Sequence, residues 1–159
     1  MRNFIGVGVA VGLLAGIWTF VSVEVTLLTW VAFVFWALFF AAGGDRAATV
    51  RTAAPALAGV GWGWAAGAVY THLWSSTLGL SVIVAVLALV LCLQAAVDLL
   101  SFIPAAFAGT AVYFGTGFDV LGSIVPLVIG VGLGYISAVL ASAIQVRVDG
   151  PAGAEPVAA

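Results

Sequence analysis

The chain has 159 residues, of which 65% are hydrophobic and only 6% carry a charged side chain, and its mean hydropathy is +1.31. A water-soluble domain carries about a quarter of its residues as charged side chains, so this composition excludes a soluble globular protein. The formal net charge of −2 gives no basis for nucleic-acid binding. Most of the surface must face membrane lipid, and each charged residue marks a loop or a functional group.

The apolar runs have room for six membrane spans of about 20 residues each. The runs Phe4–Gly44 and Thr52–Val97 are each long enough for two spans. A further span fits between Asp98 and Asp119, and the last follows Asp119. We expect spans near residues 4–22, 26–42, 52–71, 76–96, 100–117 and 122–146.

The arginines predict the orientation. Arg2 precedes the first expected span, Arg46 and Arg51 lie between the second and third, and Arg147 follows the last. With six spans all four fall on one side, and positive residues are concentrated in cytoplasmic loops. We therefore expect a multi-pass protein of the bacterial inner membrane with both termini in the cytoplasm. Residues 148–159, which are rich in Ala, Pro and Gly, are expected to form a disordered cytoplasmic tail.

The two halves of the chain resemble each other. Thr52–Val69 matches Ser123–Leu140 without a gap, in its proline and in three alternating glycines. Leu27–Asp45 matches Leu99–Asp119 in a hydroxyl residue, several aromatic residues and the final aspartate, once a short gap is allowed. Two matches in the same order, at nearly the same separation along the chain, indicate an ancient duplication.

The duplication predicts an inverted repeat, because a unit of three spans must enter the membrane from opposite sides in its two copies. In the sequence alignment Thr29 pairs with Ser101, and Phe35 pairs with Phe107. Substrate sites of such proteins lie near the membrane midplane, between the repeats. The predicted fold is an all-α integral membrane protein of six transmembrane helices, with one membrane domain over 1–147, repeat one at about 4–71 and repeat two at about 76–146.

Glycines at a spacing of one helical turn indicate close helix packing. The Gly-x-Gly-x-Gly patterns are not nucleotide-binding fingerprints, because no strand precedes them. Small residues four apart in an apolar helix let two backbones approach each other, within a subunit or between subunits of a homo-oligomer. The expected packing positions are Gly8, Gly12, Gly16, Gly59, Gly63, Gly130 and Gly134.

Polar and aromatic residues around the second and fifth spans are candidates for a solute path. Hydroxyls would bind a weakly polar solute, and facing aromatic rings would form an apolar constriction that a hydrated ion does not pass. The rings would otherwise fill a core or face lipid. Gln94 and Asp98 would line the inner mouth and Glu24 the outer, unless residues 94–104 form a break within the membrane instead of a tight turn. The predicted path consists of Thr29, Phe33, Phe35, Ser101, Phe102, Phe107, Gln94, Asp98 and Glu24.

The sequence contains no catalytic or metal-binding motif. His72 has no Ser or Cys partner at a motif spacing, and the carboxylates are scattered. Cys92 is the single cysteine, which excludes an internal disulfide. We therefore expect neither an enzyme, nor a cofactor, nor a metal.

Three functions fit these features. The first is a channel or facilitator for small neutral or weakly polar solutes, with its path between the repeats. The second is a proton-coupled transporter in which Asp98 or Glu24 titrates. The third is a structural subunit of a larger complex without a path. A path should leave a polar cavity through the subunit, whereas a structural subunit should be solid.

Three stretches resemble a known family: GLLAGIWTFVSVEVTLLTWVAF, CLQAAVDLLSFIPAAFAGTAVYFGTGFD and LVIGVGLGYISAVLA. They are similar to the YcdZ-like family of small bacterial inner-membrane proteins of unknown function. The resemblance covers most of residues 8–141, and its most specific parts are Cys92–Ala95 and Leu100–Pro104. It implies an inner-membrane location and a multi-pass topology, and it implies no activity.

Overall fold

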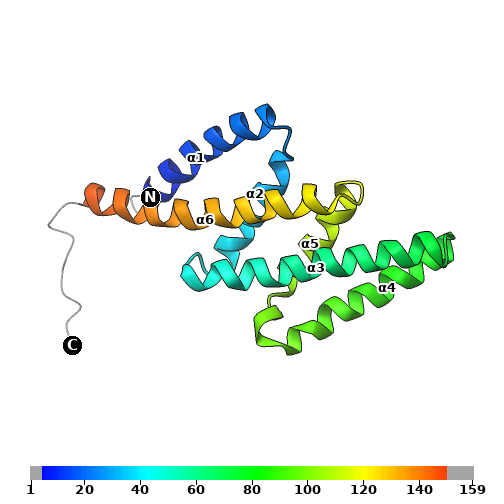
Figure 1. Ribbon diagram of the computed structural model, residues 1–159. Helices are drawn as coiled ribbons and strands as arrows, with labels where there is room; N and C mark the ends of the chain where they lie inside the picture. Colours follow the sequence, from blue (N-terminus) through cyan, green and yellow to red (C-terminus); the bar gives the residue numbers. More distant parts are fainter. Residues whose placement is uncertain (1–4, 150–159) are drawn as a thin grey trace.

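The computed structural model describes residues 5–149, and all of its regular elements in that range are helices (Figure 1). Residues 150–159, which make up most of the predicted tail, lie outside the described residues. The elements are α1 (Ile5–Glu24), α2 (Thr29–Ala41), α3 (Arg46–His72), α4 (Thr77–Leu93), the 3₁₀ turns η2 (Gln94–Ala96) and η3 (Asp98–Leu100), α5 (Ile103–Gly115) and α6 (Val120–Asp149).

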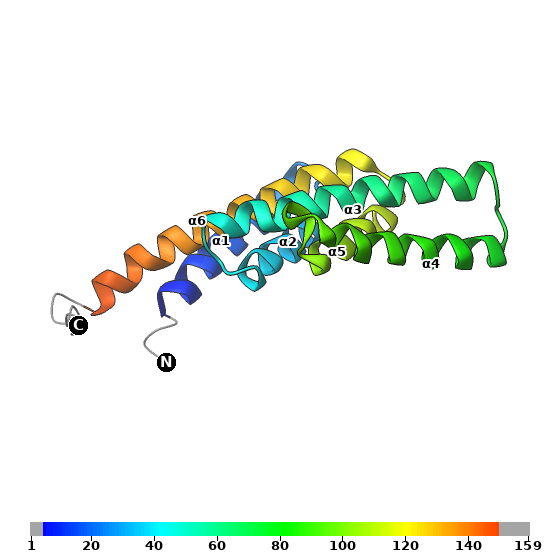
Figure 2. The same ribbon diagram turned by 90° about the horizontal axis from the view of Figure 1, so that it is seen from below.

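The long helices α3 and α6 lie side by side at the centre (Figure 1). Helix α1 packs on α6, and α4 packs on α3. The short helices α2 and α5 cross the central pair, α2 against α6 and α5 against α3. The turn between α3 and α4 lies at one end of the molecule, and the beginning of α1 and the end of α6 lie at the other (Figure 2). Each half of the chain therefore packs mainly through a short helix on the long helix of the other half.

Three stretches are long and apolar enough to cross a membrane, namely Ile5–Glu24, Thr77–Ala96 and Val120–Arg147. Helices α2 and α5 are apolar but have only 13 residues each. At 1.5 Å per residue each is about 20 Å long, which is shorter than the hydrocarbon core. Helix α3 has 27 residues but is rich in Ala and Gly, which contribute less hydropathy than Leu, Ile and Val. The membrane-protein class is thus supported, and the count of six spans stays a prediction.

The turns before α3 and α6 have the same backbone hydrogen bonds. The Gly44 N–H donates to the Phe39 carbonyl, and the Phe118 N–H donates to the Tyr113 carbonyl, each across 3.0 Å. Gly44 and Phe118 both have a φ of +69°. The bonds are those of a Schellman helix end, which turns the chain through left-handed residues. We call this correspondence, in which Phe39 pairs with Tyr113 and Gly44 with Phe118, the short-helix register.

An aspartate follows each of these turns and caps the next helix. The Asp45 carboxylate accepts a hydrogen bond from the Ala48 N–H at 2.7 Å, and the Asp119 carboxylate accepts one from the Gly122 N–H at 2.9 Å. Each bond satisfies a backbone donor that has no partner within the helix. These caps explain why α3 and α6 begin at residues 46 and 120, upstream of the expected spans 52–71 and 122–146.

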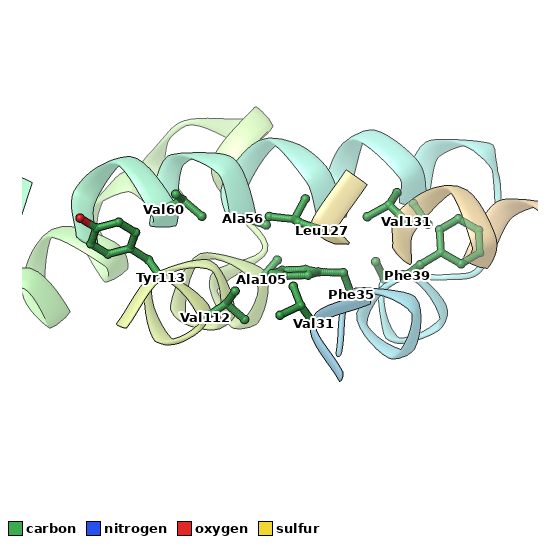
Figure 3. Close-up of a cluster of buried hydrophobic side chains, with 12 residues drawn as sticks. Val31, Phe35, Phe39, Ala56, Val60, Ala105, Val112, Tyr113, Leu127 and Val131 are labelled. Atoms are coloured by element: carbon green, nitrogen blue, oxygen red, sulfur yellow. The ribbon is translucent and has the colours of Figure 1, made fainter. Parts of the chain in front are cut away.

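The main core lies where the short and long helices cross, and it is apolar (Figure 3). Phe35 and Leu127 are fully buried there. Four helices contribute to it, namely α2, α3, α5 and α6, and small or β-branched side chains pack between larger ones. The side chains labelled in Figure 3 are Val31, Phe35, Phe39, Ala56, Val60, Ala105, Val112, Tyr113, Leu127 and Val131.

Candidate functional site

The two crossings at the centre have matching backbone contacts. A Cβ added at Gly59 of α3 would collide with the backbone of Ala106 on α5, and one added at Gly130 of α6 would collide with the backbone of Ala32 on α2. Ala32 and Ala106 correspond in the short-helix register, and the two glycines correspond in the gapless match of the long helices, which we call the long-helix register. In both crossings a glycine lets a short helix touch the backbone of a long one, which is the small-residue packing typical of membrane helices.

A second pair of glycines lies one turn further along each long helix. A Cβ at Gly63 would lie 3.1 Å from the Tyr113 ring, and one at Gly134 would lie 2.7 Å from the Phe39 ring. Gly63 and Gly134 correspond in the long-helix register, and Tyr113 and Phe39 correspond in the short-helix register. The glycines of the predicted packing positions on α3 and α6 therefore lie at contacts between the two halves of the chain. They are Gly59, Gly63, Gly130 and Gly134.

The ridge on α1 is placed differently. Nothing lies within 4 Å of a Cβ built at Gly8, Gly12 or Gly16. In the described part of the chain this ridge is uncovered, so any packing role would involve lipid or another protein chain.

The short-helix register changes the pairing of aromatic residues between the halves. Phe35 corresponds to Gly109, and Phe107 corresponds to Phe33. The sequence alignment that paired Phe35 with Phe107 is wrong, because the length difference between the halves does not fall inside α2 and α5. The same register pairs Thr29 with Ile103 and not with Ser101.

The four phenylalanines of the predicted constriction do not meet at one place. Phe35 is 0% exposed and packed in the core, and Phe102 is half-buried at its edge. Phe33 and Phe107 are 37% and 40% exposed. Phe35 was expected to line an opening, but in this conformation it fills the centre. Phe33 and Phe107 lie on the outer surface.

Phe33 and Phe107 line two surface grooves that match each other. One groove lies between α1 and α2 and the other between α4 and α5. Several lining positions correspond in the short-helix register, and in both grooves these are almost entirely apolar. The corresponding pairs are Phe33 with Phe107, Trp36 with Thr110, Ala37 with Ala111 and Phe40 with Phe114.

The hydroxyls expected along the path bond within the turns. Thr29 Oγ1 lies 2.6 Å from Ser22 Oγ, which ties the beginning of α2 to the end of α1. Ser101 Oγ donates to the Asp98 carbonyl across 2.8 Å. Both hydroxyls therefore already have partners.

The residues expected at the two mouths also lie at turns. Glu24 and Asp98 are exposed. Gln94 accepts a hydrogen bond from the Trp62 indole N–H, 3.0 Å from nitrogen to Oε1. Its Nε2 is buried and makes no hydrogen bond within the described residues. The two N–H donors of the Gln94 amide are thus unused beside the 3₁₀ turns that join α4 to α5.

Five serines and threonines are buried in residues 5–147, in addition to the buried aromatic side chains of Trp18, Trp36 and Tyr113, which also carry polar atoms. Ser137 Oγ accepts from the Trp36 indole N–H at 2.9 Å, and Thr110 Oγ1 donates to the Gly59 carbonyl at 2.7 Å. Sequence reasoning did not single these out, because a hydroxyl in an apolar helix often bonds only its own backbone. The set is Ser22, Thr52, Thr110, Ser123 and Ser137.

The described residues contain no group of three His, Cys, Asp or Glu side chains that could hold a metal ion. The centre is an apolar helix crossing with hydroxyl groups, and the core cluster of the described residues contains no carboxylate and no basic side chain.

Comparison with known proteins places this fold in a family. The family model described as "Protein of unknown function (DUF1097)" matches residues 8–142. The chain is 33% identical over 140 residues to the Inner membrane protein YcdZ of Escherichia coli K12, covering 85% of this chain and 83% of that protein. It is 32% identical over 148 residues to the Uncharacterized protein YahC of the same organism, covering 86% and 90%. No solved structure matches the chain. The chain belongs to the DUF1097 family.

Proposed function

We propose that this protein is a facilitator for small neutral or weakly polar solutes in the bacterial inner membrane, built from two inverted repeats of three helices. Repeat one consists of α1, α2 and α3, and repeat two of α4, α5 and α6. The path runs between the repeats and is closed in the conformation described above. A relative named as an inner membrane protein supports the location.

The matched crossings carry this proposal. Gly59 with Ala106 and Gly130 with Ala32 form the same contact twice, between elements from opposite halves of the chain. Each half has three helices, which is an odd number. Two halves with the same fold therefore cross a membrane in opposite directions, and the second is inverted relative to the first. Arg46 and Arg51 in the first turns of α3 and Arg147 in the last turn of α6 would then face the cytoplasm together with both termini.

The buried polar groups favour a neutral solute over proton coupling. A proton-coupled carrier needs a titratable group on its path. In the described residues the carboxylates of Glu24 and Asp98 are exposed at turns, and the buried side chains with polar atoms are serines, threonines, two tryptophans and Tyr113, none of them a carboxylate. Hydroxyls bind neutral solutes through hydrogen bonds and do not exchange protons at neutral pH.

Phe35 is the gate of the proposed path. It is 0% exposed, and it comes from the short helix of one repeat and packs in the core shared with the long helix of the other. The corresponding position in the second repeat is Gly109, so one ring closes the centre. Opening requires α2 to shift relative to α6, and the close contact at Gly130 provides a point about which the two helices can turn.

The test is solute flux through proteoliposomes that contain the full chain, with a series of amides of increasing size. Phe35→Ala removes the gate and should raise the flux of small amides above that of the wild type. Phe33→Ala is the matched control, because this ring lies on the same helix but on an outer groove. The facilitator would be ruled out by one result: vesicles with folded wild-type or Phe35→Ala protein are no more permeable than empty vesicles.

A structural subunit without a path is the second candidate, and the solid centre favours it. The uncovered ridge of Gly8, Gly12 and Gly16 would then be a docking face for another chain, either a further copy or a different subunit. In that case Gly12→Ile should weaken assembly in detergent and leave solute flux unchanged. A facilitator that works as a homo-oligomer should lose both assembly and flux.

A further inference from the structure

One shallow groove on the surface has a partly polar lining, unlike the two matched apolar grooves. It lies between the first turns of α3 and the middle of α6 and has a volume of about 370 Å³. It is lined by Arg46, Thr49, Val50 and Tyr135. A guanidinium, an aliphatic hydroxyl and a phenol thus share one concave surface on an otherwise apolar protein.

The arginine of this groove is uncommitted. Within residues 5–147 the Arg46 guanidinium makes no ion pair, and the side chain is exposed. Arg51, further along the same helix, donates from Nη1 to the Ala42 carbonyl across 2.6 Å and so is occupied in closing the α2–α3 turn. The adjacent Asp45 carboxylate is bonded to the Ala48 N–H. The groove therefore presents one cation that no side chain of the described chain neutralises.

The other half of the chain has no such lining at the corresponding place. Counted from the equivalent caps Asp45 and Asp119, Arg46, Thr49 and Val50 correspond to Val120, Ser123 and Ile124, and Tyr135 corresponds to Trp64 in the long-helix register. The polar lining is therefore not needed for the packing of a long helix on its partner. The arginine of this lining has no counterpart in the second half of the chain.

We propose that this groove binds the phosphate group of an anionic phospholipid. The Arg46 guanidinium matches phosphate oxygens in geometry and charge. The hydroxyls of Thr49 and Tyr135 are further donors, and the exposed apolar side chain of Val50 would lie along the beginning of an acyl chain. In the proposed orientation the lipid would belong to the cytoplasmic leaflet, whereas the binding itself does not depend on whether the protein transports a solute.

The experiment is thermal unfolding of the purified full chain in a non-ionic detergent, with native mass spectrometry of the same samples to count bound lipids. Three additions are compared: phosphatidylglycerol, phosphatidylcholine with the same acyl chains, and inorganic phosphate. Phosphatidylglycerol should raise the melting temperature and appear as a bound lipid. Arg46→Gln should weaken this binding roughly tenfold, and Tyr135→Phe should weaken it less.

Arg147→Gln is the matched control, because Arg147 is an exposed arginine that does not line the groove. It should keep the effect of phosphatidylglycerol. Arg46→Lys keeps the charge but loses the bidentate geometry, so it should bind phosphatidylglycerol with intermediate affinity. This variant provides the test if Arg46→Gln is poorly folded. Equal binding of both lipids, or equal losses in Arg46→Gln and Arg147→Gln, would overturn the proposal. An equal shift with inorganic phosphate alone would replace the lipid by a free anion.

Discussion

The indole N–H of Trp36 on α2 donates a buried hydrogen bond to Ser137 Oγ on α6, 2.9 Å from nitrogen to oxygen. Ser137 donates its own hydrogen to the Gly134 carbonyl, at 2.7 Å. Both side chains have less than a tenth of their surface exposed. This is a direct side-chain hydrogen bond between the two halves of the chain, and it holds the short helix in a fixed rotation on the long one.

Ser137→Ala should therefore lower the free energy of unfolding in mixed micelles by about 1–3 kcal/mol, because the Trp36 N–H would be left buried without a partner. Adding Trp36→Phe to this variant removes the orphaned donor, so the double variant should lose less than the sum of the two single changes. Ser142→Ala is the control, since the exposed Ser142 hydroxyl bonds only its own helix. An additive double variant would show that the bond has no stabilising role.

The glycine crossings predict equal sensitivity in the two halves. Gly59→Ala and Gly130→Ala should each destabilise the fold, by about 1–3 kcal/mol or more, because the new methyl group meets backbone atoms that cannot move aside. Gly61→Ala and Gly132→Ala are matched controls with nothing within 4 Å. These should be neutral or slightly stabilising, because alanine favours the helix. The measurement is unfolding in detergent, and a tolerated Gly59→Ala would contradict the contact.

A separate prediction concerns Gly44 in the turn before α3. Gly44 has a φ of +69°, so Gly44→Ala should cost about 1–2 kcal/mol from backbone strain alone. The equivalent residue Phe118 already bears this strain, while its ring packs on Tyr113 at a centroid distance of 5.7 Å. Phe118→Gly should thus lose ring packing and gain backbone relaxation, and its net effect should be smaller than that of Phe118→Ala. Equal losses in Phe118→Gly and Phe118→Ala would contradict this.

The proposed orientation predicts the accessibility of single cysteines in intact cells. In a Cys92→Ser background, cysteines at His72 or Asp119 should react with a membrane-impermeant reagent added from outside. Cysteines at Arg46 or Asp149 should react only after permeabilisation. A cysteine at position 46 that is labelled from outside would remove both the orientation and the inverted repeat.

Much of the fold could be predicted from the sequence, because a long apolar run in lipid forms a helix, which satisfies its own backbone hydrogen bonds. The helices over Ile5–Glu24 and Thr77–Leu93 lie close to the expected spans 4–22 and 76–96, and the all-helical class is confirmed. The turn residues Asp45 and Asp119 were also visible as a repeated feature. Their role as caps, which sets the helix beginnings, has no signature in hydropathy.

The site was harder to predict, for a physical reason. A membrane helix that is apolar all round gives no periodicity to show which face is buried. Phe33 and Phe35 differ by two positions in α2, yet one lies on an outer groove and the other fills the centre. The pairing of Phe35 with Phe107 was wrong because aromatic residues are frequent enough in both helices for more than one alignment to look acceptable.

The difference between the two registers has a consequence for insertion into the membrane. More residues separate Asp45 from Thr52 than separate Asp119 from Ser123, so the first half carries a short additional segment. This longer segment holds Arg46 and Arg51. Apart from it, the two halves share the turns before α3 and α6, their aspartate caps and the contacts of Gly59 and Gly130, so the proposed inverted repeat would present a similar shape to the bilayer either way up. A chain without these two arginines keeps only Arg2 and Arg147 as orienting charges, so it should insert with a weaker preference for cytoplasmic termini, and one short stretch of helix carries half of the charge that orients the protein.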